Sequence, residues 1–168
     1  MKMRNRVITS LVGAVSTAIA VVAMTAAPAN AYNPDPRVIQ HDAQHTVYCP
    51  CRFNDDIDGT YFKKDDGGLG TKTVFGNASG YALAKVEFHP YDEIVLMYDV
   101  ANDGDGLYYK VSYEGDGGRY GLYTPPGTSA AWDTRKVNLD IPEGRKVTIT
   151  VYDDRAMNDW VHTITATA

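Results

Sequence analysis

The chain has 168 residues, of which 21 are acidic and 16 are lysine or arginine, so its formal net charge is −5 at neutral pH. An acidic balance argues against nucleic acids and anionic membranes as partners, because phosphate-bearing surfaces bind clustered lysine and arginine. The length suits one domain that buries a core without depending on disulfides.

Residues 1–31 have the parts of a secretory signal peptide. Lys2, Arg4 and Arg6 charge the start, residues 7–27 form an apolar run, and Ala-Asn-Ala at 29–31 suits a signal peptidase. We therefore expect a mature protein that begins at Tyr32, with a formal charge of −8 once the three basic residues are removed. No later run is long enough to span a bilayer, and no cysteine sits at the cleavage point to carry a lipid. These features predict a secreted, extracellular protein without membrane contact.

Residues 32–45 predict an extended N-terminal arm ahead of the folded domain. Pro34 and Pro36 disfavour a helix, and the segment shows little apolar periodicity. An extended segment can add a strand to a partner's sheet or fill a partner's cleft. The candidate partner-binding side chains are Tyr32, Arg37, Val38 and Ile39. A disordered tail is the alternative, because chain termini are often poorly ordered.

From residue 46 onward, short β-type segments alternate with clusters of glycine and aspartate. Within 81–88, the even-numbered apolar residues fall on one face of a strand. The other expected strands are 46–53, 60–64, 71–75, 93–100, 107–113, 119–123, 135–141, 146–153 and 160–167. Such close spacing leaves no room for crossover helices. We predict an all-β fold, an antiparallel β-sandwich that is immunoglobulin-like or related, over residues 46–168.

Three glycine-containing connections predict β-hairpins. They are residues 102–106, 114–118 and 142–145, and each lies between two expected strands.

The sequence Cys49-Pro50-Cys51 contains the only two cysteines. In an oxidising compartment two thiols of one chain usually form a disulfide, so we expect Cys49 and Cys51 to pair at the base of the arm. Intermolecular bridging and a metal site that includes His41 and His45 are the alternatives.

Residues 54–65 resemble a calcium-binding loop. Asn54, Asp56 and Asp58 would supply oxygens and Asp65 would close the shell, while a glycine at position 59 permits the turn. Position one is Asn rather than Asp, and the closing acid is the shorter Asp. An ordinary turn of a β-protein is therefore the alternative to a calcium site.

No catalytic signature is present, which favours a protein that is not an enzyme. Ser79, Ser112 and Ser129 lie outside any Gly-x-Ser-x-Gly elbow. His89 and His162 have no acid that the sequence alone would pair with them. Paired carboxylates assembled in space are the remaining catalytic alternative, because the chain is rich in acids.

The signal with its Ala-x-Ala site, the proline-containing arm, the acidic Tyr- and Gly-rich domain and the closing strands 146–152 and 159–164 together resemble small secreted actinobacterial β-sandwich proteins. Among these, the chain is similar to the adaptor subunit of umbrella toxin particles. That resemblance implies a non-catalytic linker between a repeat scaffold and a lectin-bearing, trypsin-like subunit. The arm at 32–45 would then be the element that inserts into a partner.

Two other functions are compatible with these residues. A peptidase inhibitor would present Arg37 or a rigid loop to a protease. A carbohydrate-binding module, organised by calcium, would stack glycans on exposed rings. The candidate rings are Tyr120, Tyr123, Trp132 and Trp160.

Overall fold

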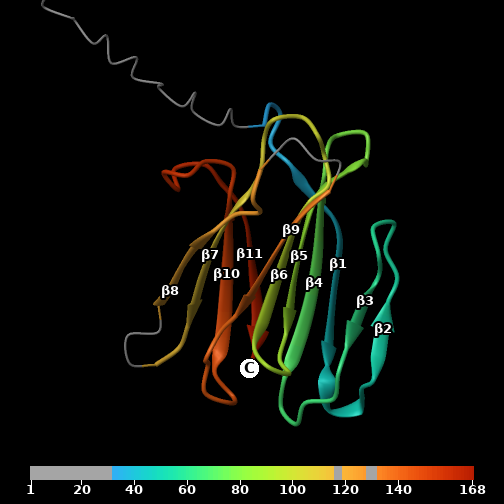
Figure 1. The fold of residues 1–168 in the computed structure, drawn as a ribbon, viewed down its shortest axis with the longest axis vertical. Coiled ribbons are helices and arrows are strands. Elements are labelled where there is room, and N and C mark those ends of the chain that lie inside the picture. Colours follow the sequence, from blue (N-terminus) through green and yellow to red (C-terminus); the bar gives the residue numbers. More distant parts are fainter. Residues whose placement is uncertain (1–31, 116–118, 128–131) are drawn as a thin grey trace, which may run out of the picture.

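A computed structural model describes residues 32–115, 119–127 and 132–168, so the predicted signal peptide lies outside the described residues. Within these ranges the fold is all-β and holds no α-helix (Figure 1). No helix among the described residues is long and apolar enough to cross a membrane. The strands are β1 (Arg37–His45), β2 (Cys51–Phe53), β3 (Thr60–Phe62), β4 (Leu69–Gly76), β5 (Ala82–His89), β6 (Ile94–Asp99), β7 (Tyr108–Tyr113), β8 (Arg119–Tyr123), β9 (Asp133–Asn138), β10 (Lys146–Tyr152) and β11 (Trp160–Thr167), and a short 3-10 turn spans Thr46–Tyr48.

One curled antiparallel sheet contains most of these strands. Its order is β8-β7-β10-β11-β4-β5-β6-β9, and β1 pairs with β4 beside that path. The two halves of this order, β8 to β11 and β4 to β9, contribute side chains to one shared core. The prediction of an all-β, antiparallel fold is confirmed.

The two faces of β5 have different chemistry. Ala84, Val86 and Phe88 point into the core and are at most 2% exposed, which confirms the apolar face expected from the alternation. Lys85 and Glu87 lie on the opposite face and are equally buried. Something must therefore cover the outer face of the sheet at β5.

The cover is the small hairpin of β2 and β3 with the loop that joins them. Phe62 of β3 packs so closely on Gly70 of β4 that a Cβ there would lie 2.8 Å from the ring. The same ring contacts Phe53 and His89, with centroid distances of 5.6 and 5.0 Å. The hairpin is thus fixed to the sheet through its aromatic residues.

Two of the three predicted hairpins are wrong. Residues 142–145 lead from β9 to β10, but β9 pairs with β6 while β10 pairs with β7 and β11. Residues 102–106 likewise connect β6 to β7, which belong to different halves of the sheet. Of the three predicted connections, only the one at 114–118 joins strands that pair with each other, β7 and β8. A turn with a glycine at positive φ, such as Gly144 at +74°, occurs in connections that cross between the two halves of the sheet as well as in hairpins.

The predicted N-terminal arm is also corrected by the structure. Residues 37–45 form β1, an antiparallel partner of β4 in the main sheet rather than a segment outside the domain. Val38 lies opposite Phe75 and packs against the core, so this one apolar contact helps to seat the strand. The sequence of β1 shows no clear apolar alternation, because most of its side chains are polar and face solvent or the loop between β2 and β3.

Candidate functional site

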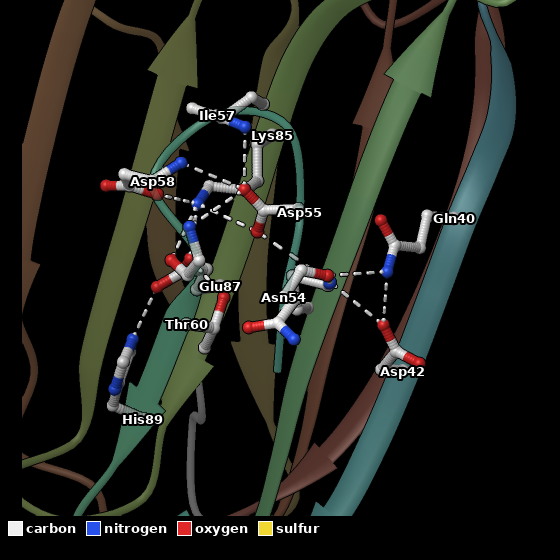
Figure 2. A network of polar contacts seen from close by, with 12 residues as sticks. Gln40, Asp42, Asn54, Asp55, Ile57, Asp58, Thr60, Lys85, Glu87 and His89 are labelled. Carbon is white, nitrogen blue, oxygen red and sulfur yellow. Dashed lines mark hydrogen bonds and ion pairs between the residues drawn. The ribbon is translucent and has the colours of Figure 1, made fainter. Parts of the chain in front are cut away.

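The loop between β2 and β3 is organised around Asp55. Its Oδ1 accepts hydrogen bonds from the main-chain N–H groups of Ile57, Asp58 and Gly59 at 2.9, 3.0 and 3.0 Å. Burial alone would raise the pKa of Asp55, but these N–H groups and the ammonium of Lys85 hold it below its ordinary value. Gly59 adopts φ +72°, which a residue with a Cβ rarely tolerates. The loop is therefore closed by its own side chain (Figure 2).

Lys85 rises from β5 into this loop and is completely buried. Its Nζ donates to the Gly59 carbonyl oxygen at 3.2 Å, to Asp55 at 3.3 Å and to Asp58. A further contact of 2.8 Å joins it to Glu87 Oε1. Burial would lower the pKa of the Lys85 ammonium, but the bonds to Asp58 and Glu87 raise it. The oxygens of the loop thus surround an ammonium group of the chain itself.

Glu87 extends the network along β5 (Figure 2). Thr60 donates its hydroxyl to Oε1 at 2.6 Å, and His89 Nε2 lies 2.7 Å from Oε2. Burial opposes ionisation of Glu87, yet the bonds from His89, Lys85 and Thr60 leave its pKa lowered. Because Thr60 bonds the acid rather than the imidazole, these residues do not form the nucleophile–base pair of a hydrolase.

A second buried ammonium, that of Lys72 on β4, connects the loop to β1. It lies 2.9 Å from Asp42 Oδ2 and donates to the Asn54 carbonyl oxygen at 3.0 Å. The Gln40 amide donates to the same two residues at 2.9 and 3.0 Å. The outer face of β1 is therefore held in place by charge-assisted hydrogen bonds.

The predicted calcium ligands are not brought together. Among the described residues, only two acidic groups converge within 4.8 Å, Asp55/Asp58/Glu87 and Asp35/Asp153/Asp159. Asp58 is the one predicted ligand in either group, and it bonds Lys85. Asn54 offers its main-chain carbonyl to Lys72 instead of its side chain to a metal.

The two other predicted ligands, Asp56 and Asp65, lie apart from this network. Asp56 lines the groove beside β1. The N–H of Asp65 donates to the Thr46 carbonyl oxygen at 3.3 Å, while its Oδ1 is buried without a hydrogen-bond partner. Calcium binding by Asn54, Asp56, Asp58 and Asp65 has no assembled site here. The sequence pattern was misleading because the cation comes from a strand 27 residues away.

The predicted cysteine pair is present as an intrachain disulfide. Cys49 and Cys51 are bonded at a Cα–Cα distance of 4.4 Å, and Cys51 is the first residue of β2. Cys49 is buried, with 5% of its surface exposed. The bond therefore lies at the base of the covering hairpin, near the end of β1.

Of the four predicted partner-binding residues, three lie together and one does not. Tyr32 is partly buried against the core, with its hydroxyl buried, so its ring is not offered to a partner. The others line an open groove of about 540 Å³ beside the start of β1. The groove residues are Arg37, Val38, Ile39, Gln40, Asp56 and Gly80.

The edge of β1 that faces away from β4 carries no strand. Over its nine residues, β1 pairs only with β4 among the described strands. β11 approaches it, with His41 and His162 rings 6.5 Å apart, but the two strands form no ladder. The main-chain groups on this side of β1 therefore have no partner strand among the described residues.

The sequence missed Lys72 and Lys85 as the charges that organise this region. The alternation within 81–88 puts Lys85 on the face opposite Val86, but nothing in a single strand shows that an acidic loop lies over it. The alternating pair Lys85 and Glu87, following an Asp-rich loop, was the only available signal.

Comparisons with protein-family models, with curated proteins and with solved structures give no match for this chain. Fold and site together define a small all-β protein in which a buried ionic network supports an open edge strand.

Proposed function

We propose that the protein is a secreted, non-enzymatic interaction module that binds an extended segment of another secreted protein along β1. The resemblance of the sequence favours an adaptor subunit of an extracellular, toxin-type complex. In this proposal the two halves of the curled sheet are the layers of an immunoglobulin-like sandwich, and β1 lies at an open edge. The formal charge of −8 expected for the mature chain favours a partner segment of net positive charge.

The observation that carries this proposal is the unpaired edge of β1. An exposed edge strand offers a row of N–H and C=O groups, and natural proteins usually protect such edges with charges, prolines or cover. The edge strand β9 follows that rule, since it carries Arg135 and Lys136. β1 carries one arginine, Arg37, at its first position, and no lysine. A partner strand could bond this edge while its side chains enter the adjoining groove.

The buried network supports the proposal by making β1 rigid before a partner arrives. Gln40 and Asp42 bond the covering loop and Lys72, so the strand does not need to become ordered on binding. Pre-organisation of this kind raises affinity because less conformational entropy is lost.

A lysine on the edge tests the proposal. Ile39 and Val47 are 37% and 36% exposed, but only Ile39 lies on β1 and lines the groove. We expect Ile39→Lys to abolish co-purification of the companion protein from native culture supernatant, while Val47→Lys retains it. Both variants should keep the thermal midpoint of the original protein, which excludes loss of folding as the cause.

Two results would argue against this function. One is a mature protein that purifies natively as a monomer without a companion. The other is equal capture of the same companion by Ile39→Lys and by the original protein, which would place the interface elsewhere.

A carbohydrate-binding function is the second candidate, supported by a cavity of about 310 Å³ on the outer face of β5. Arg52, Asp58, Tyr61 and His89 line this cavity, and Tyr61 is 51% exposed. Polar groups beside an aromatic ring are typical of glycan sites. Retention on polysaccharide that Tyr61→Ala removes and Trp160→Ala leaves intact would favour this function. If neither variant alters retention, this cavity is not the glycan site.

A further inference from the structure

A second acidic group consists of Asp35, Asp153 and Asp159, and it shares no residue with the group formed by Asp55, Asp58 and Glu87. Carboxylate oxygens of these residues lie within 4.8 Å of one another. Asp153 is only 1% exposed, and neither of its side-chain oxygens has a hydrogen-bond partner. Burial of an unpaired carboxylate costs free energy, so a positive charge bound at this site would stabilise the protein.

The loop after β10 holds Asp153 and Asp159 close to each other. The N–H of Asp153 donates to the Asp159 carbonyl oxygen at 2.9 Å. Asp154 Oδ1 accepts the N–H groups of Asn158 and Asp159 at 2.7 and 2.8 Å. Asp153 and Asp159 are therefore fixed beside each other by main-chain bonds.

No lysine, arginine or histidine among the described residues forms an ion pair with this group. Burial, followed by the charges of Asp159, Asp35 and Asp105, raises the pKa of Asp153 to about 7. The main-chain N–H of Tyr32 acts in the opposite direction, although its geometry falls short of a hydrogen bond. The main-chain nitrogen of Tyr32 therefore lies near the Asp153 carboxylate without bonding it.

Tyr32 is also the residue at which the mature protein is expected to begin. Hydrolysis of the bond between residues 31 and 32 by a signal peptidase adds the hydroxyl of water to the carbonyl carbon of residue 31 and a proton to the Tyr32 nitrogen. That nitrogen then takes up a further proton from solvent, because an α-amino group has a pKa of about 8. An amide with one N–H becomes an ammonium with three.

We propose that Asp35, Asp153 and Asp159 form the binding site for the α-ammonium group that signal-peptide cleavage leaves on Tyr32. Burial of the Tyr32 ring against the core holds the new terminus at the site. Processing thereby supplies the missing counter-charge and fixes the chain five residues before β1 begins. The inference rests on cleavage after residue 31 and does not depend on the proposed partner.

A thermodynamic cycle tests the site. The mature protein that starts at Tyr32 is compared with one carrying Gly-Ser ahead of Tyr32, which moves the ammonium away. Each form is made with the original sequence, with Asp153→Asn and with the control Asp66→Asn, whose side chain is 74% exposed in a surface ion pair. At pH 7 we expect the extension to lower the thermal midpoint of the original and control proteins by about 5 °C or more. In Asp153→Asn the extension should change it little.

Two results would overturn the proposal. The first is an extension that lowers the midpoint equally with and without Asp153, or not at all. The second is a thermal midpoint that rises when calcium chloride is added to the protein starting at Tyr32, but does not rise in Asp153→Asn. That result would assign the site to a divalent cation.

The pKa of the α-amino group gives a readout that does not depend on the stability of Asp153→Asn. Nuclear magnetic resonance of protein labelled at Tyr32 should show this pKa raised above its ordinary value of about 8, because three carboxylates favour the ammonium. An ordinary value in the protein with Asp153 intact would contradict the proposal.

Discussion

Lys85 shows how one residue can replace the ion that a sequence motif suggests. Its ammonium is fully buried. It donates hydrogen bonds to oxygens of the loop at 55–59 and forms an ion pair with Glu87. Buried ion pairs add less to net stability than their number suggests, because both charges must leave water. Removal of one partner is nevertheless severe, because the remaining charges stay buried without compensation.

Lys85→Met should therefore destabilise the protein by about 3–5 kcal/mol, since Asp55 and Glu87 would keep their charges in the interior. The matched control is Lys64→Met, because Lys64 pairs with Asp66 at the surface, with both side chains more than half exposed. That change should cost less than about 1 kcal/mol. Urea denaturation followed by circular dichroism measures both. Equal losses would mean that the network is not buried in solution.

Asp99 predicts a distinct pH dependence. Its pKa is raised from 3.8 to about 6, first by burial and then by the charges of three nearby aspartates, Asp103, Asp133 and Asp105. The hydrogen bond from the N–H of Ala101 lowers the pKa but does not offset these effects. The folded protein thus keeps a proton that the unfolded chain releases, so the contribution of Asp99 to stability decreases as pH rises through this interval. Asp99→Asn should be more stable than the original protein at pH 7 and lose that advantage at about pH 4. Denaturant midpoints that shift equally at both pH values would show that Asp99 does not titrate this way.

At the scale of elements, the strands were easier to predict than their partners. Alternation located β5, β10 and β11 because each has one apolar face in the core. The connections at 102–106 and 142–145 had turn chemistry, but turn residues do not specify whether the next strand returns beside the last one or crosses the core. β1 was missed as a strand because a single core contact, Val38, is surrounded by polar side chains.

The β2–β3 hairpin depends on a close approach to β4. Gly70→Ala would place a Cβ 2.8 Å from a carbon of the Phe62 ring, which is itself 1% exposed. We expect the hairpin to shift and the free energy of unfolding to fall by about 1–3 kcal/mol. Gly121→Ala is the control, since its nearest atom would lie at an ordinary 3.4 Å. Thermal unfolding distinguishes the two variants, and an unchanged midpoint for Gly70→Ala would contradict the observed packing.

At the scale of the whole molecule, the sequence predicts an acidic protein but not how its acids are distributed. Asp55, Asp58 and Glu87 gather around Lys85, whereas Asp35 and Asp153 gather where no basic side chain pairs with them among the described residues. Composition could not separate the two groups, because the members of each group come from distant parts of the chain. One group stabilises the support of β1, and the other is the site that we propose for the mature terminus.

These observations converge on β1, whose outer face is fixed by the network and whose free edge is open to a partner strand. Hydrogen exchange of the mature protein, alone and with its co-purified companion, tests that claim most directly. The account predicts that amide exchange slows across residues 37–45 on binding, and that Ile39→Lys removes this protection while Val47→Lys keeps it. Unchanged exchange in β1, with protection at another surface, would contradict it.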